Sequence, residues 1–162
     1  MCDVRQAAEL GGFSMRHPNS IKLMAATRRQ RPYLDFVIDG RPLAAHLCSG
    51  RNCEIDFISP FGWQGEGARK IEAEAAERLL LRAPPDLRSG RYSLLVCPEC
   101  ADLGCGAVTA AIERKGDLFI WRLFGFETSY GEAIDFESFS HIREFAFNRR
   151  DYSGSFRKYV TA

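Results

Sequence analysis

The sequence predicts an α+β fold in which an antiparallel sheet is packed by one main helix and a short C-terminal helix. Short apolar runs bounded by turn residues recur along the chain and are typical of β-strands. A segment near the middle has the apolar spacing of an amphipathic helix. The 162 residues suffice for one domain with its own core, and we find no linker or repeat. We therefore expect a single domain over residues 1–162, with residues 1–19 poorly ordered because they lack periodicity.

The first half of the chain is predicted to contribute a hairpin and two short elements. Residues 33–38 (YLDFVI) are typical of a strand and are closed by an Asp-Gly turn, and residues 21–24 are the expected partner strand. Residues 43–47 are expected to form a short helix. Residues 55–58 alternate in polarity and predict a short strand that ends at a Ser-Pro pair.

The main helix is predicted over residues 67–82. Ala68, Ile71, Ala75 and Leu79 recur three or four residues apart and would lie on one face. Two consecutive prolines end the segment, since proline cannot continue a helix.

The second half predicts an antiparallel meander. Residues 92–97, 107–112 and 118–124 are apolar runs joined by short connections. In the last of these runs, alternation would place Phe119, Trp121 and Leu123 on one face, with Leu118, Ile120 and Phe124 on the other.

A further strand and a terminal helix are predicted near the end of the chain. Residues 142–147 alternate weakly and are expected to add a strand. Asn148 is the expected N-cap of the helix that follows, although Gly154 lowers its propensity.

Residues 97–106 (CPECADLGCG) are the most informative segment, because three cysteines fall within nine residues of chain. Their spacing is C-x2-C-x4-C, and they lie in the predicted connection between two strands. A tight turn brings such thiolates together, and proline after the first cysteine suits it by fixing φ. We therefore treat Cys97, Cys100 and Cys105 as candidate ligands of a structural zinc ion.

A structural zinc site needs four ligands, and this turn offers three. The candidates for the fourth are His46, Cys48 and Cys53. The alternative is that the cysteines are reduced and pack as small apolar residues around a glycine-rich turn.

Redox chemistry at the same three cysteines is the remaining interpretation. A reactive thiolate needs a lowered pKa, usually from a helix N-terminus or a nearby cation. The charged residues within the turn are Glu99 and Asp102, which oppose thiolate formation. The sequence therefore favours metal binding or packing over redox activity.

Composition and charge narrow the function classes. The net charge is +1, from 22 basic and 21 acidic residues, which is unlike the basic surface of a nucleic-acid-binding protein. No apolar run is long enough to span a membrane, and the first residues lack the apolar region of a signal peptide. We therefore expect the six cysteines to be reduced thiols or metal ligands in a cytoplasmic protein.

The segment from Leu95 to Glu127 resembles a group of uncharacterised bacterial proteins. They carry a C-P-x-C-x-D-L-G-C-G-A-V-T turn between strands and a later tryptophan strand. Residues 78–87 (RLLLRAPPDL) are also similar to that group, whereas the first half of the chain is not. The resemblance implies a shared fold and carries no established activity. Ala101 stands where that turn often has a glycine.

No complete catalytic set is recognisable in the sequence, nor is a phosphate-binding or dinucleotide-binding motif. The leading hypothesis is therefore a binding or interaction protein, of the accessory or immunity kind, with a protein partner and a cysteine hairpin that holds a structural metal. The alternative is a thiol-based redox enzyme that uses Cys97, Cys100 and Cys105.

Overall fold

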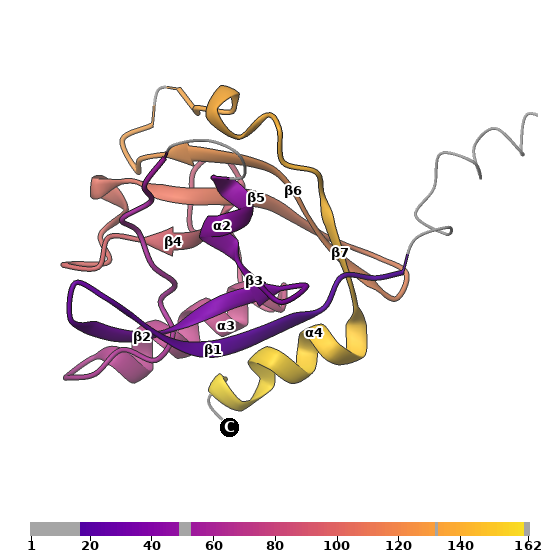
Figure 1. Ribbon diagram of the computed structural model, residues 1–162, viewed down its shortest axis with the longest axis horizontal. Helices are drawn as coiled ribbons and strands as arrows, with labels where there is room; N and C mark the ends of the chain where they lie inside the picture. Colours follow the sequence, from indigo (N-terminus) through magenta and orange to yellow (C-terminus); the bar gives the residue numbers. More distant parts are fainter. Residues whose placement is uncertain (1–16, 49–52, 132, 161–162) are drawn as a thin grey trace, which may run out of the picture.

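The computed structural model describes residues 17–48, 53–131 and 133–160. It confirms the α+β class: two antiparallel sheets enclose an apolar core together with helices. Figure 1 shows the indigo strands of the first sheet in the lower half of the view and the orange strands of the second above them. The yellow helix α4 (Arg149–Phe156) lies along the bottom of the view.

The first sheet has the order β1-β2-β3. Strands β1 (Ile21–Arg28) and β2 (Arg31–Ile38) form the predicted hairpin, and its two-residue turn has positive φ at both positions. Such a turn matches the right-handed twist of the strands that it joins. The short strand β3 (Arg41–Pro42) leads directly into helix α2 (Leu43–Leu47), which has the predicted bounds.

The second sheet is the predicted meander, with the order β4-β5-β6-β7. Its strands are β4 (Tyr92–Val96), β5 (Ala107–Lys115), β6 (Leu118–Glu127) and β7 (Phe145–Asn148). Each is antiparallel to its neighbour. The cysteine turn therefore connects two adjacent strands of one sheet, as expected.

A β-bulge in β6 corrects the predicted distribution of its side chains. One residue of β5, Ala110, lies opposite both Leu123 and Phe124, because the register shifts between the pairs on either side. Leu123 adopts a positive φ of 54° and is 58% exposed. Phe124 takes its place in the core with Phe119 and Trp121. Leu123 was predicted on the face of Phe119 and Trp121, and Phe124 on the opposite face. Both predictions were wrong, because the extra residue of the bulge reverses the alternation of side chains beyond it.

A buried ion pair fixes this bulge. The Arg91 Nε donates a hydrogen bond to Glu127 Oε2 at 2.9 Å, and both side chains are almost fully buried. The Thr109 hydroxyl donates to the same carboxylate oxygen at 2.7 Å. The Arg91 guanidinium also donates to the Leu123 carbonyl, which the bulge turns toward it.

Helix α3 (Ala68–Leu79) confirms the predicted main helix and is shorter at its C-terminal end. Its Ala75 and Leu79 are buried in the shared core. Helix α4 begins after Asn148, whose side chain accepts a hydrogen bond from the Asp151 N–H at 2.9 Å, as a cap does.

Aromatic rings join the two sheets and α4 into one core. Phe36 of β2 packs edge-on against Trp121 of β6, with ring centroids 5.4 Å apart. Trp121 Nε1 donates to the Tyr152 hydroxyl at 3.0 Å, and this hydroxyl donates to the Leu79 carbonyl at 2.7 Å. These buried polar groups are therefore paired, and they tie α4 and α3 to the sheet.

Two local expectations need correction. Residues 55–58 form no strand; only Ile58 pairs, in an isolated bridge with Val96. Pro60 follows closely and lacks the N–H that would extend the ladder. Residues 1–19 were expected to be poorly ordered, and residues 1–16 of these lie outside the described part. Asn19 is held in place, because its N–H donates to the Ala146 carbonyl at 2.7 Å.

Candidate metal centre at the cysteine turn

The cysteine turn (residues 97–106) begins where β4 ends and reaches β5 through a short 3-10 helix, Leu103–Cys105. Its first loop is closed by the Ala101 N–H, which donates to the Cys97 carbonyl at 2.9 Å. Asp102 begins the 3-10 helix by accepting a hydrogen bond from the Gly104 N–H at 2.7 Å. Both bonds fold the chain back on itself, so that all three cysteines lie on one compact turn.

Ala101 has a φ of 58°, in the left-handed region. Glycine adopts this region without steric cost, whereas alanine does not. Ala101 therefore adopts a backbone conformation that a glycine would adopt at lower steric cost.

The three cysteine sulfurs form a compact group. They lie within 4.8 Å of one another, and Cys100 Sγ is 3.4 Å from Cys105 Sγ. Sulfurs that bind one tetrahedral zinc ion at about 2.3 Å are separated by about 3.8 Å. Cys97 is half-buried, whereas Cys100 and Cys105 are exposed. A small adjustment of the side chains would place a metal ion between them.

The turn provides hydrogen bonds to sulfur that stabilise thiolates. Burial tends to raise the pKa of Cys97, but the backbone N–H groups of Glu99 and Cys100 and the neighbouring thiols donate toward its sulfur and bring the pKa below its ordinary value. The Asp102 N–H lies 3.4 Å from Cys100 Sγ. Hydrogen bonds to Cys100 and Cys97 raise the pKa of Cys105 to about 11, because its proton is shared with their sulfurs. Cys97 therefore loses its proton at lower pH than Cys105.

The two acidic residues of the turn are engaged away from the sulfurs. Glu99 Oε2 is 3.7 Å from the Arg31 guanidinium of β2. Asp102 accepts the Gly104 N–H. The expected opposition of these acids to a thiolate is outweighed at Cys97, where hydrogen bonds from backbone N–H groups lower the pKa of the thiol.

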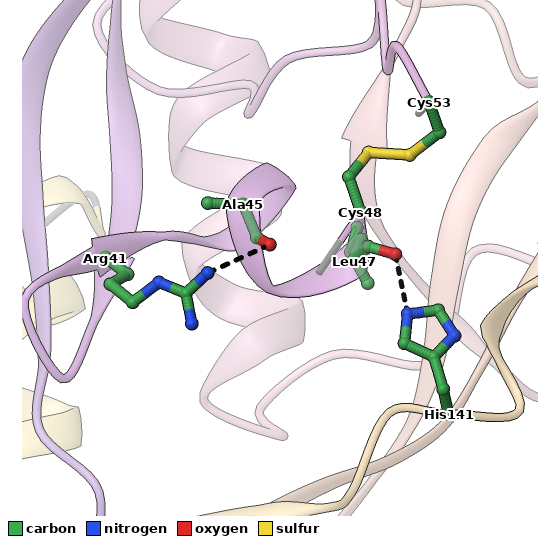
Figure 2. Close-up of a disulfide and its surroundings, with 6 residues drawn as sticks. All are labelled: Arg41, Ala45, Leu47, Cys48, Cys53 and His141. Carbon is green, nitrogen blue, oxygen red and sulfur yellow. Dashed lines mark hydrogen bonds between the residues drawn. A yellow bond between two sulfur atoms is a disulfide. The ribbon is translucent and has the colours of Figure 1, made fainter. Parts of the chain in front are cut away.

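Cys48 and Cys53 form a disulfide, with their Cα atoms 5.6 Å apart (Figure 2). The expectation that they are reduced is therefore wrong. Cys48 ends α2, and the chain returns five residues later within reach of its sulfur. Such bonds are rare in reducing compartments, so the cysteines do not support a cytoplasmic location.

None of the three candidates for a fourth ligand joins the sulfur group among the described residues. Cys48 and Cys53 are bonded to each other and offer no thiolate. His46 Nε2 lies 2.8 Å from the Ile38 carbonyl oxygen. In the same region His141 lies 2.9 Å from the Leu47 carbonyl, and its ring points toward α2 in Figure 2.

Tyr130 lies beside the cysteine turn, and the sequence analysis did not identify it. A Cβ built on Gly104 would lie 3.2 Å from the Tyr130 hydroxyl and 3.1 Å from its ring. The neighbouring Ser129 N–H donates to the Leu103 carbonyl at 3.0 Å, and Tyr130 is 80% exposed. No local pattern indicates this contact, because it depends on how the chain returns after β6.

A hollow of about 660 Å³ lies beside Phe126, whose ring contacts Gly106 at the end of the turn. Phe57 and Phe126 stack along its wall with ring centroids 5.5 Å apart, and its apolar lining is completed by Leu47, Ile55, Val108 and Phe139. Its volume is that of a small-molecule site.

A comparison of the chain with family models, curated proteins and solved structures matches none of them. The resemblance to the bacterial group therefore stays a prediction. In the described part of the chain, no helix is long and apolar enough to cross a membrane.

Proposed function

We propose that the cysteine turn binds one thiophilic metal ion, with zinc as the first candidate, and that the chain is a binding protein whose surface around the turn depends on this ion. The observation that carries the proposal is the sulfur group: Cys97, Cys100 and Cys105 lie within 4.8 Å of one another on a single turn. Thiolate ligands select zinc and other soft ions over magnesium and calcium.

Two further features support metal binding over simple packing. Cys100 and Cys105 are exposed, whereas cysteines that serve as small apolar residues are usually buried. Backbone N–H groups lie near sulfurs of the turn, where they would offset the charge of bound thiolates.

The location of the turn supports a binding role. It forms the connection between β4 and β5, and the exposed ring of Tyr130 lies beside it. Exposed aromatic side chains are effective anchors at protein interfaces. A metal ion would keep the turn and this neighbouring loop in one arrangement, ready for a protein partner.

Elemental analysis of protein purified without added metal tests the proposal. We expect close to one zinc ion per chain, and a chelator should lower the melting temperature because the ion binds only the folded turn. The variant Cys97→Ser should lose the metal. The paired change Cys48→Ser and Cys53→Ser is the matched control and should retain it. A folded wild-type protein that has free thiols and takes up no zinc would overturn the proposal.

A thiol-based redox enzyme is the second candidate, favoured by the lowered pKa of Cys97 and by the 3.4 Å contact between Cys100 and Cys105 sulfurs. In this reaction two thiols of the turn would lose two electrons and two protons to a disulfide substrate, which would leave as two thiols. The test is a single turnover: the reduced protein should convert about one equivalent of oxidised glutathione to two of glutathione and gain one disulfide in the turn, and Cys97→Ser should abolish this reaction.

A further inference from the structure

We propose that the hollow of about 660 Å³ beside Phe126 binds a small organic amine. The apolar body of this ligand lies against Phe57 and Phe126, and its ammonium group lies at Asp135. The inference goes beyond the proposed metal site and does not depend on it, because the described residues that line the hollow do not include the cysteines of the turn.

The walls of the hollow leave apolar side chains in contact with water. Two lining residues, Leu47 and Val108, are buried. The other aliphatic and aromatic lining residues are only half-buried: Ile55, Phe57, Phe126 and Phe139. A ligand that removes this surface from water gains free energy in proportion to the area covered. The volume also lies within the range of about 300–1,000 Å³ that is common for small-molecule sites.

Backbone pairing holds a carboxylate beside the aromatic wall. Phe126 and Asp135 form an antiparallel bridge, in which the Phe126 N–H donates to the Asp135 carbonyl at 3.1 Å and the Asp135 N–H donates to the Phe126 carbonyl at 2.9 Å. The side chains of two directly opposed residues lie on the same face, and both of these line the hollow. An aromatic ring and a carboxylate side by side suit an ammonium group, because it is attracted by both.

Asp135 is kept in its ionised form. Its carboxylate accepts hydrogen bonds from the Ser138 hydroxyl at 2.6 Å and from the Ser138 N–H at 3.1 Å. These bonds lower the pKa of Asp135 below its ordinary value of 3.8. Ser138 is neutral, so it orients the carboxylate without cancelling its charge.

Glu54 adds a second carboxylate to the lining. Asp56 also lines the hollow, but Arg28 and Arg29 pair with it at 3.5 and 3.0 Å, and its charge is therefore already compensated. The negative charge that these residues offer to a ligand comes from Asp135 and Glu54. It favours a cation over a neutral or anionic ligand, and a primary ammonium can also donate hydrogen bonds to the carboxylate.

The wall formed by residues 53–57 is tied to the rest of the fold at both ends. Cys53 is joined by the disulfide to Cys48, which ends α2 (Figure 2). Ile58, the residue after this wall, pairs with Val96 of β4. The hollow is therefore already formed without a ligand, and a preformed site loses less conformational freedom on binding.

NMR titration of the isotope-labelled full chain, without reductant, tests the proposal. The three probes have similar size and different charge: phenethylamine, phenethyl alcohol and phenylacetate. We expect saturable shifts at the amides of residues that line the hollow. Phenethylamine should bind about fivefold more tightly than phenethyl alcohol, because attraction to exposed carboxylates is modest, and phenylacetate should bind most weakly.

Substitutions separate the two parts of the site. Asp135→Asn retains an oxygen that can accept from Ser138 and should remove most of the preference for the amine, with the affinity for phenethyl alcohol unchanged. Asp117→Asn, on the exposed turn between β5 and β6, is the matched control and should keep the preference. Phe57→Leu removes the stacked ring and should weaken both probes alike.

Several results would overturn the proposal. They are equal binding of the amine and the alcohol, tighter binding of phenylacetate, shifts confined to another part of the chain, and the absence of saturable shifts with any probe. The phenylacetate arm also covers Arg51, which lies outside the described part of the chain. The zinc content of the wild-type protein is measured separately, so failure of the amine site leaves the metal site standing.

Discussion

The ring of Phe126 lies directly against the backbone of Gly106, so that a side chain at this glycine would occupy the space of the ring atoms. Gly106 is the last residue of the cysteine turn and has a φ of 96°. The same ring stacks on Phe57 at the wall of the 660 Å³ hollow. Phe126 therefore joins the cysteine turn to the apolar interior.

We expect Gly106→Ala to destabilise the fold by more than about 2 kcal/mol, because it combines a strained φ with a steric clash against Phe126. Gly116→Ala is the matched control: its φ of 61° is also positive, but nothing lies within 4 Å of the added Cβ. Urea unfolding of both variants measures the difference. Equal losses would mean that the Phe126 contact contributes nothing.

The buried ion pair between Arg91 and Glu127 predicts a large effect of removing one partner. Glu127→Ala should lower the free energy of unfolding by about 3–5 kcal/mol, because it leaves a buried guanidinium without its countercharge. Glu113→Ala breaks the exposed pair with Arg122 and should cost about 0–1 kcal/mol. Denaturant unfolding of the two variants checks the contrast, and similar losses would contradict it.

The thiols of the turn should differ in reactivity when the protein is free of metal. The pKa of Cys97 lies below its ordinary value of 9.0, whereas that of Cys105 is raised to about 11. As the pH rises, iodoacetamide should therefore reach its half-maximal rate at Cys97 before Cys105, since only thiolates are alkylated. Mass spectrometry of the labelled peptides measures each midpoint. A midpoint for Cys97 at or above the ordinary value would remove the redox alternative.

Asp35 of β2 gives a pH dependence of stability. Burial raises the pKa of Asp35 above 3.8, and a backbone hydrogen bond from Phe36, the Arg28 charge and a hydrogen bond from Tyr33 offset this only in part. The neutral carboxyl of Asp35 is thus favoured more in the folded protein than in the unfolded chain. As the pH rises above 3.8, ionisation of this carboxyl therefore lowers the free energy of unfolding.

Asp35→Asn removes this penalty. We expect the variant to be more stable than the wild type at neutral pH, with the advantage fading in acid, where the wild-type carboxyl is protonated in both states. Urea unfolding of the wild type and of Asp35→Asn, from acid to neutral pH, measures the difference in their free energies of unfolding. Asp117→Asn, on the exposed turn between β5 and β6, is the control and should shift stability little at any pH.

Much of the fold follows from local information. The hairpin of β1 and β2, helices α2 and α3 and the meander were each predicted from apolar periodicity and turn residues, which act over a few positions. The Asn148 cap is equally local, because its partner Asp151 is three residues away. Local patterns fail at the bulge of β6, where the pairing with β5 inserts a residue and turns Leu123 to solvent.

The cysteine turn was likewise predictable from the sequence in one respect and decided by the tertiary structure in others. The sequence by itself determined that Cys97, Cys100 and Cys105 share one connection between strands, because the apolar runs on either side of them predict two strands. Only the tertiary structure decided what surrounds them. It paired Cys48 with Cys53 and left His46 on the Ile38 carbonyl. It also brought Tyr130 and Phe126 to the turn, because such contacts depend on strand register and on the path of the chain between sheets.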